Sequence, residues 1–241
     1  MTKSFLLIAA WLGAASGLAA HPYQDAVEAA RPDEKALQQA RKQLDQPPVP
    51  AREQPLFVPS FHQQPVTEET PVLLCHECHG RSPHRHGARK RAFLNMHARR
   101  IACETCHWRP EAVSPGYDRL RMPGARADEE GLIAPWVDGR PVVTLSGEPW
   151  ARRLMRDWEQ ADKSGRSVIK ARLHHPLEKT GPRCTDCHDS NNSLLNWKSL
   201  GYPEARLRVL RENPVARFLQ RTEPKSADDP VTRIQLRDLL E

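Results

Sequence analysis

The sequence has little apolar material for a chain of 241 residues. Hydrophobic residues make up 39% of it and aromatic residues 6%, and the 12 glycines (about 5%) raise the apolar share to about 44%, just under the roughly 45–50% of ordinary globular domains. Proline is abundant instead, with 22 residues, which disfavours long helices and broad sheets. The length fits one domain or two small ones, and the composition indicates that something besides side chains fills the interior.

Long apolar runs are absent beyond the first twenty residues. Residues 1–20 combine a positive start at Lys3, an apolar stretch and a small-residue end suited to cleavage after Ala19 or Ala20, as in a secretory signal peptide. An uncleaved anchor is the alternative, but about sixteen apolar residues fall short of the ~20 that span a bilayer. We therefore predict export to the periplasm and a mature chain that does not span the membrane.

All six cysteines belong to three copies of one motif, and none is left over. The six cysteines form three Cys-x-x-Cys pairs, and a histidine follows each pair directly: Cys75, Cys78 and His79; Cys103, Cys106 and His107; Cys184, Cys187 and His188. In Cys-x-x-Cys-His the two thiols form thioethers to haem c, and the imidazole becomes the proximal iron ligand. With 11 histidines in 241 residues, three such coincidences by chance have a probability of roughly one in ten thousand.

Three other kinds of cysteine site compete with haem attachment. A zinc site uses two Cys-x-x-Cys knuckles, which leaves one of the three without a partner and the histidines unexplained. A thioredoxin-like pair requires a βαβ context, and the sequence shows none. Disulfides suit an exported protein but also leave the histidines unexplained, so we favour three covalently attached haem c groups, each with one iron.

With these motifs and the export signal, the sequence resembles multihaem c-type cytochromes. The resemblance implies a mainly α fold with extensive irregular structure, short helices, little sheet and a core made mostly of porphyrin. Such a core accounts for the low apolar content, because each haem is a large flat apolar body. The same logic predicts that the chain does not fold without haem, as small metal domains do not fold without their ion.

Histidines also lie shortly upstream of each motif, and these are the candidate distal ligands: His62, His97, and the adjacent His174 and His175. This loose repeat resembles class III (cytochrome c3 and c7-like) multihaem cytochromes, which implies two imidazoles per iron. His84 and His86 are competitors of His62, and the spacing favours His97 for the first haem. Met122 is a weaker candidate, and a methionine ligand would raise the redox potential.

Organisation along the chain follows the motifs. We expect a helix and a proline-rich tether over 21–60, a first haem module with two neighbouring haems over 61–110, and a linker rich in glycine and proline over 111–149. A helix, the third haem and a helical cap follow over 150–241. Helices are predicted from Pro32-Asp33 onward, over 149–161, 203–212, 214–220 and 231–240, because proline or acidic residues open them, and a strand is predicted around 141–145.

Basic residues are concentrated between the first two motifs. From residue 81 to residue 110 there are eight Lys and Arg residues against one acid, Glu104. Such density can indicate nucleic-acid binding, which we exclude for an exported haem protein. The cations either neutralise haem propionates or dock an acidic or membrane-bound redox partner, and the sequence favours neither.

Together these features predict a periplasmic triheme cytochrome that passes single electrons between redox partner proteins. Two imidazoles per iron imply low-spin, low-potential haems, and no catalytic residue is assigned. One alternative is an enzyme with one open haem that reduces nitrite or a peroxide, although no acid–base cluster near a motif favours it. Another is a haem-bearing subunit of a larger respiratory complex.

Overall fold

The computed structural model describes residues 21–46, 72–84, 88–121, 131–189 and 191–221, without the side chains of residues 88–90. About half of this part is helical, beside one small sheet. The mainly α class with little sheet is therefore confirmed at this level. The predicted signal segment, the tether over 47–60 and the helix over 231–240 lie outside the described residues.

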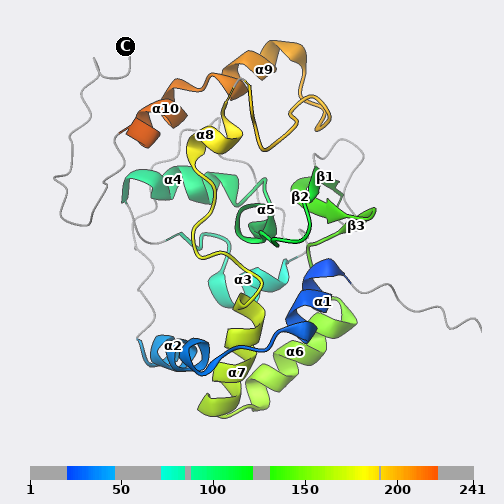
Figure 1. Ribbon diagram of the computed structural model, residues 1–241, viewed down its shortest axis with the longest axis vertical. Coiled ribbons are helices and arrows are strands. Elements are labelled where there is room, and N and C mark those ends of the chain that lie inside the picture. Colours follow the sequence, from blue (N-terminus) through cyan, green and yellow to red (C-terminus); the bar gives the residue numbers. More distant parts are fainter. Residues whose placement is uncertain (1–20, 47–71, 85–87, 122–130, 190, 222–241) are drawn as a thin grey trace, which may run out of the picture.

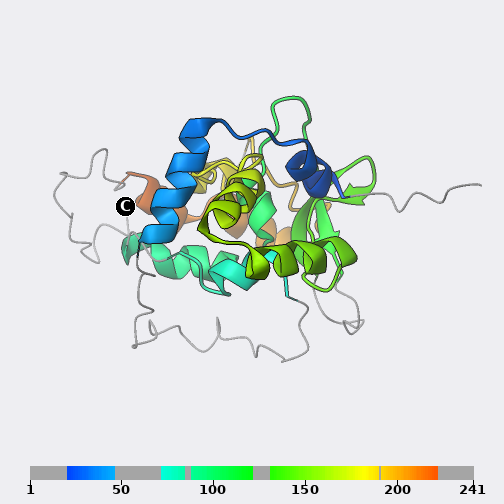
Figure 2. The ribbon, with the colours of Figure 1, turned by 90° about the horizontal axis from the view of Figure 1, so that it is seen from below.

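Four helices form one end of the molecule. They are α1 (Pro22–Ala29), α2 (Glu34–Asp45), α6 (Pro149–Gln160) and α7 (Lys163–His174). Helix α7 contacts the other three and lies between α2 and α6 (Figure 2). Asp33 accepts a hydrogen bond from the Ala36 amide at the start of α2, as an N-cap residue does, so the predicted start of this helix is confirmed.

A buried apolar cluster joins this helical end to the first two motifs. It contains Tyr23 and Val27 of α1, Trp150 of α6, Leu74 before the first motif and Trp108 after the second. Residues far apart in the sequence thus share one core. The helix predicted over 149–161 is confirmed as α6, and the aromatic ring at its start is buried in this cluster.

The sheet has three antiparallel strands, β1 (Gly116–Leu120), β2 (Leu132–Val137) and β3 (Arg140–Pro141). Between β2 and β3 the chain turns at Asp138 and Gly139, both with positive φ of 50° and 73°, which is the Asp-Gly turn that suits a tight hairpin. The strand predicted around 141–145 was only partly right, because β3 ends at Pro141 and the longer strands β1 and β2 were not predicted.

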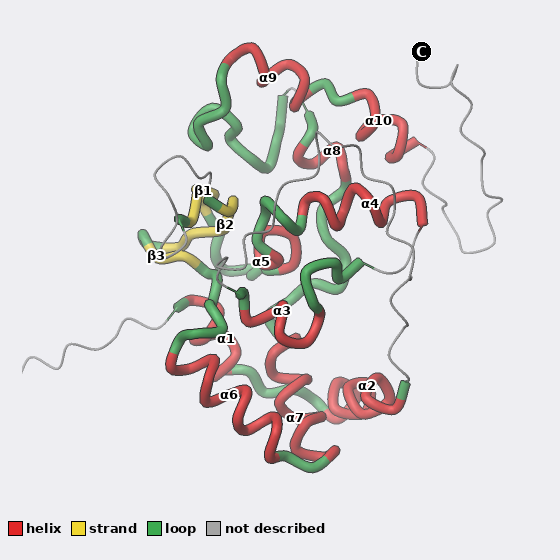
Figure 3. The backbone as a smooth tube through the Cα atoms, turned by 180° about the vertical axis from the view of Figure 1, so that it is seen from behind, coloured by secondary structure: helices red, strands yellow, loops and turns green. Residues whose placement is uncertain are grey.

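Three short helices carry the Cys-x-x-Cys-His motifs: α3 (Leu74–His79), α5 (Cys103–His107) and α8 (Cys184–Cys187). Along the long axis of the molecule α5 lies between α3 and α8 (Figures 1 and 3). Backbone bridges hold the flanking chain in place, one from Leu73 to Leu145 and one from Ile101 to Ile133 in β2. The sheet and its continuation thereby position the first two motif helices.

Two helices, α9 (Glu204–Arg211) and α10 (Pro214–Arg221), cover the end of the molecule that carries α8 (Figure 1). Both were predicted in these places. Another apolar cluster, with Leu195, Trp197, Leu200 and Leu207, packs against the Cys187 side chain. In the described part of the chain, no helix has the length and apolar character needed to cross a membrane.

Candidate functional site

Each motif forms one helical turn that collects its chemical groups. The two cysteines are at positions i and i+3 and the histidine is at i+4, and residues at these spacings share one face of a helix. All six cysteines are free thiols. Each turn therefore presents two thiols and one imidazole on the same side, which is the arrangement that haem attachment requires.

Every motif histidine faces a second histidine from elsewhere in the chain. The three pairs are His79 with His174, with ring centroids 5.9 Å apart; His107 with His84, at 6.5 Å; and His188 with His97, at 6.1 Å. The rings of these pairs meet at different interplanar angles of 71°, 23° and 47° respectively. The common feature is thus the separation of the rings and not a shared stacking geometry.

This separation matches what a metal between two imidazoles requires. A metal bonded at about 2.0–2.1 Å to a nitrogen of each ring, on opposite sides, puts the two centroids about 6–6.5 Å apart. Among the described residues, no group of three or more His, Cys, Asp or Glu side chains is arranged to hold a metal ion. Two protein ligands per site is the number that a haem iron takes when porphyrin supplies the other four.

Hydrogen bonds to backbone carbonyls set the tautomer of three of these rings. The Nδ1 atom of His107 bonds to the carbonyl oxygen of Glu178 at 2.9 Å, that of His174 to Lys170 at 2.8 Å, and that of His188 to Leu210 at 2.6 Å. A carbonyl only accepts, so Nδ1 must be the donor. In a neutral ring Nε2 is then unprotonated and available to a metal, as in known histidine ligands.

The surrounding protein favours the neutral form of four paired rings. Burial is the largest cause that lowers the pKa of His79, His84, His97 and His174 below the ordinary value. The paired imidazole adds to this at His79, at His84 and at His97, because two positive charges would repel. Neutral imidazole is the form that binds a metal.

The second motif touches both of the others. Cys75 and Cys103 interact electrostatically, and the Cys75 thiol donates to Glu104 Oε1 at 3.4 Å. On the other side, Cys106 and Cys187 interact electrostatically. Burial raises the pKa of Cys106 to about 11 and that of Cys187 to about 12. The expectation that the first two sites are close neighbours agrees with these contacts.

Trp197 supports the third motif. Its ring stacks on His188 with centroids 5.8 Å apart and planes inclined by 25°, and its Nε1 donates to the Cys187 carbonyl at 3.1 Å. Ser193 Oγ donates to the same carbonyl at 2.6 Å. These contacts hold the end of α8 in place although the helix itself has only four residues.

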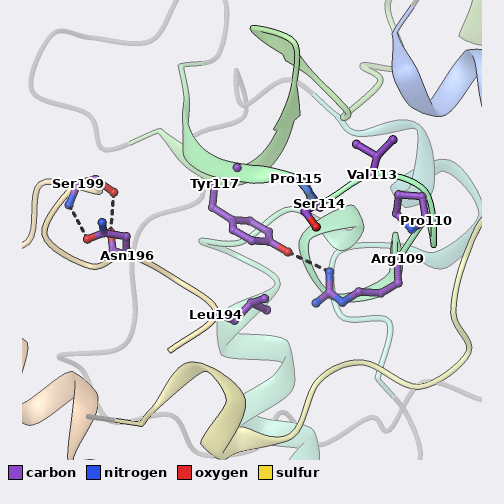
Figure 4. A pocket seen from close by; sticks show the side chains of 10 residues that line it. Arg109, Pro110, Val113, Ser114, Pro115, Tyr117, Leu194, Asn196 and Ser199 are labelled. Carbon is purple, nitrogen blue, oxygen red and sulfur yellow. Dashed lines mark hydrogen bonds between the residues drawn. The ribbon is translucent and has the colours of Figure 1, made fainter. Parts of the chain in front are cut away.

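A surface pocket of about 600 Å³ lies near the second and third motifs (Figure 4). Arg109, two residues after the second motif, donates from Nη1 to the Tyr117 hydroxyl at 3.2 Å. Apolar walls from Val113 and Leu194 complete much of the lining. None of the six paired histidines lines this pocket, so the paired rings and the pocket are separate features.

The structure brings together some predicted ligands and not others. The spacing in the sequence suggested that His97 serves the first motif, but in the structure it faces the third, because α4 (Ala88–His97) directs its end toward α8. His174 faces the first motif, whereas its neighbour His175 belongs to none of the three histidine pairs. His62 lies outside the described residues. His84, which we ranked only as a competitor of His62, faces the second motif.

The basic stretch is described in part. Arg81 and Arg99 are exposed, whereas Arg91, Arg100 and Arg109 are partly buried. Position 85 and the side chains at 89 and 90 lie outside the described residues. His21, at the predicted cleavage junction, bonds through Nδ1 to the Pro141 carbonyl at 3.1 Å and through Nε2 to Glu148 at 3.2 Å, which gives it a structural role.

No family model, no curated protein and no solved structure matches this chain.

Proposed function

We propose that this protein is an exported triheme c-type cytochrome that transfers single electrons between redox partner proteins. The cysteines of each motif tether a haem through thioethers, and two histidines bind each iron. On this proposal the ligand pairs are His79 with His174, His107 with His84, and His188 with His97. When bound, each haem supplies a reversible one-electron couple.

One observation carries the proposal: all three motif histidines have a second histidine opposite at 5.9–6.5 Å. The Cys-x-x-Cys-His sequence alone requires no partner for its imidazole. Partners at the same separation in three places, recruited from α7, α4 and the segment after α3, fit sites with two axial ligands. Burial favours the neutral form of His79, His84, His97 and His174, and carbonyl bonds orient the rings of His107, His174 and His188.

Electron transfer is favoured over substrate reduction for the same reason. An enzyme of the nitrite- or peroxide-reducing kind needs an open or water-bound position on one iron. Each motif histidine instead has a second imidazole within 5.9–6.5 Å, which supports two protein ligands on each iron. Paired imidazoles also imply lower potentials than a Met/His pair.

We also propose a periplasmic location and an acidic redox partner. Haem attachment by thioethers and the signal-like residues 1–20 both fit a periplasmic protein. Exposed cations such as Arg81 and Arg99 suit an acidic partner, whose approach they would speed. Electron exchange should then slow as ionic strength rises.

A redox titration of the haem-loaded protein tests the proposal. Three electrons should enter and leave each chain reversibly, and cyanide or nitrite added to the ferric protein should leave the spectrum unchanged. A high-spin band that shifts with cyanide would identify an open site and favour the enzyme. Uptake of fewer than three electrons would contradict the triheme assignment.

A further inference from the structure

His84 differs from the other five paired histidines in its local setting. His79, His97, His107 and His174 end helices, and His188 directly follows one. His84 instead lies in a segment with no helical or strand hydrogen bonding. Its own backbone therefore does not fix the direction of its ring, and another group has to do so.

Asn95 supplies three hydrogen bonds to this one residue. Its Nδ2 donates to the His84 carbonyl at 3.1 Å, and its Oδ1 accepts from the His84 backbone amide at 3.0 Å and from Nδ1 at 3.2 Å. Asn95 is on α4, two residues before His97. A single carboxamide thus ties the loop that carries the second distal ligand to the helix that carries the third.

The direction of these bonds determines the tautomer of His84. A carbonyl can only accept, so the Asn95 nitrogen faces the His84 carbonyl and the Asn95 oxygen faces the other two groups. Because that oxygen accepts, Nδ1 of His84 carries the proton. Nε2 of the neutral ring is then the nitrogen left to bind a metal, on the ring that faces His107.

We propose that Asn95 is the positioning residue of the second haem site: its carboxamide holds the His84 loop and the Nδ1-protonated tautomer, and so makes His84 a ligand. This inference rests on the proposed function. An acceptor on Nδ1 also raises the electron density that the ring gives to a metal. The chemical strength of that acceptor should consequently influence the potential of this site and leave the other two unchanged.

Two substitutions separate these roles in the haem-loaded protein. Asn95→Leu removes all three bonds, so one of three haems should become high-spin in the ferric state, and added imidazole should restore its low-spin spectrum. Asn95→Asp loses the bond to the His84 carbonyl but keeps an acceptor for Nδ1 and makes it anionic. All three haems should therefore stay low-spin, and one potential should fall. Asn192→Leu, at an exposed asparagine, is the matched control and should change neither.

Comparison with His84→Ala identifies the haem concerned. If Asn95 acts through His84, the double variant His84→Ala/Asn95→Leu should have the spectrum of His84→Ala alone, because the two changes remove one function. Three low-spin haems with unchanged potentials in both Asn95 variants would overturn the inference, as would additive effects in the double variant. Three covalent low-spin haems in the unmodified protein test the proposed function separately.

Discussion

Glu104 should make the stability of the protein fall as the pH rises. This glutamate is the second residue of the second motif and is 1% exposed. Its Oε2 has no hydrogen-bond partner in the structure, and its Oε1 accepts from the Cys75 thiol. Burial is the largest cause that raises the pKa of Glu104 from 4.5 to about 8, and the charge of Cys103 adds to it. Thioethers at Cys75 and Cys103 would have neither a proton to donate nor a charge, which leaves burial as the dominant effect.

The sign follows from proton binding in the two states. Between pH 4.5 and about 8 the folded protein keeps the Glu104 proton and the unfolded chain loses it, so the free energy of unfolding decreases as the pH rises. Below this window both states are protonated and the contribution is fully present. At about 1.36 kcal/mol per pKa unit, the whole shift corresponds to a loss on the order of 5 kcal/mol above the window.

Glu104→Gln tests this prediction, because glutamine has a similar shape and no charge at any pH. The haem-loaded variant and parent are unfolded in urea at pH 5, 7 and 9. We expect the urea midpoint of the variant to exceed that of the parent by an amount that grows as the pH increases. Glu77→Gln changes an exposed glutamate of the first motif and should leave the pH profile of the parent intact. Parallel profiles for the parent and Glu104→Gln would refute the reasoning.

Further predictions concern the ligands and the third site. His97→Ala removes the ring opposite His188 and should make one of three ferric haems high-spin by electron paramagnetic resonance, whereas an unchanged spectrum would remove His97 from the ligand set. His62→Ala should leave all three haems low-spin, because each motif histidine already faces another ring; a new high-spin signal would contradict the pairing. Trp197→Ala should lower the free energy of unfolding by about 3–5 kcal/mol, since Trp197 is 4% exposed and stacks on His188; a loss below about 1 kcal/mol in chemical denaturation would show that this contact contributes little.

Local signals in the sequence predicted helices α2, α6, α9 and α10, whereas α1, α4 and α7 were not predicted. Asp33 and the acidic residue after it mark the start of α2, and Pro149 marks the start of α6, because N-caps and first-turn prolines act within one helical turn. The strands were harder to predict. Pro135 lies inside β2, where proline argues against a strand, and the pairing of β1 with β2 depends on the tertiary structure.

The histidine pairs show which part of the candidate site the sequence does not predict. Each motif is a local pattern, so all three motif histidines could be named in advance. Their partners are set by tertiary contacts: His97 is near the second motif in sequence but faces the third in space. His84 was ranked only as a competitor of His62, and the signal that identifies it is the hydrogen bonding of Asn95.

The central claim is most directly tested by counting covalent haems in protein purified from a host that attaches haem c. Intact mass and the pyridine haemochrome spectrum should give three haems per chain, and the ferric protein should show only low-spin signals, as expected for two histidines on every iron. Fewer than three haems, or a high-spin species in the unmodified protein, would contradict the account.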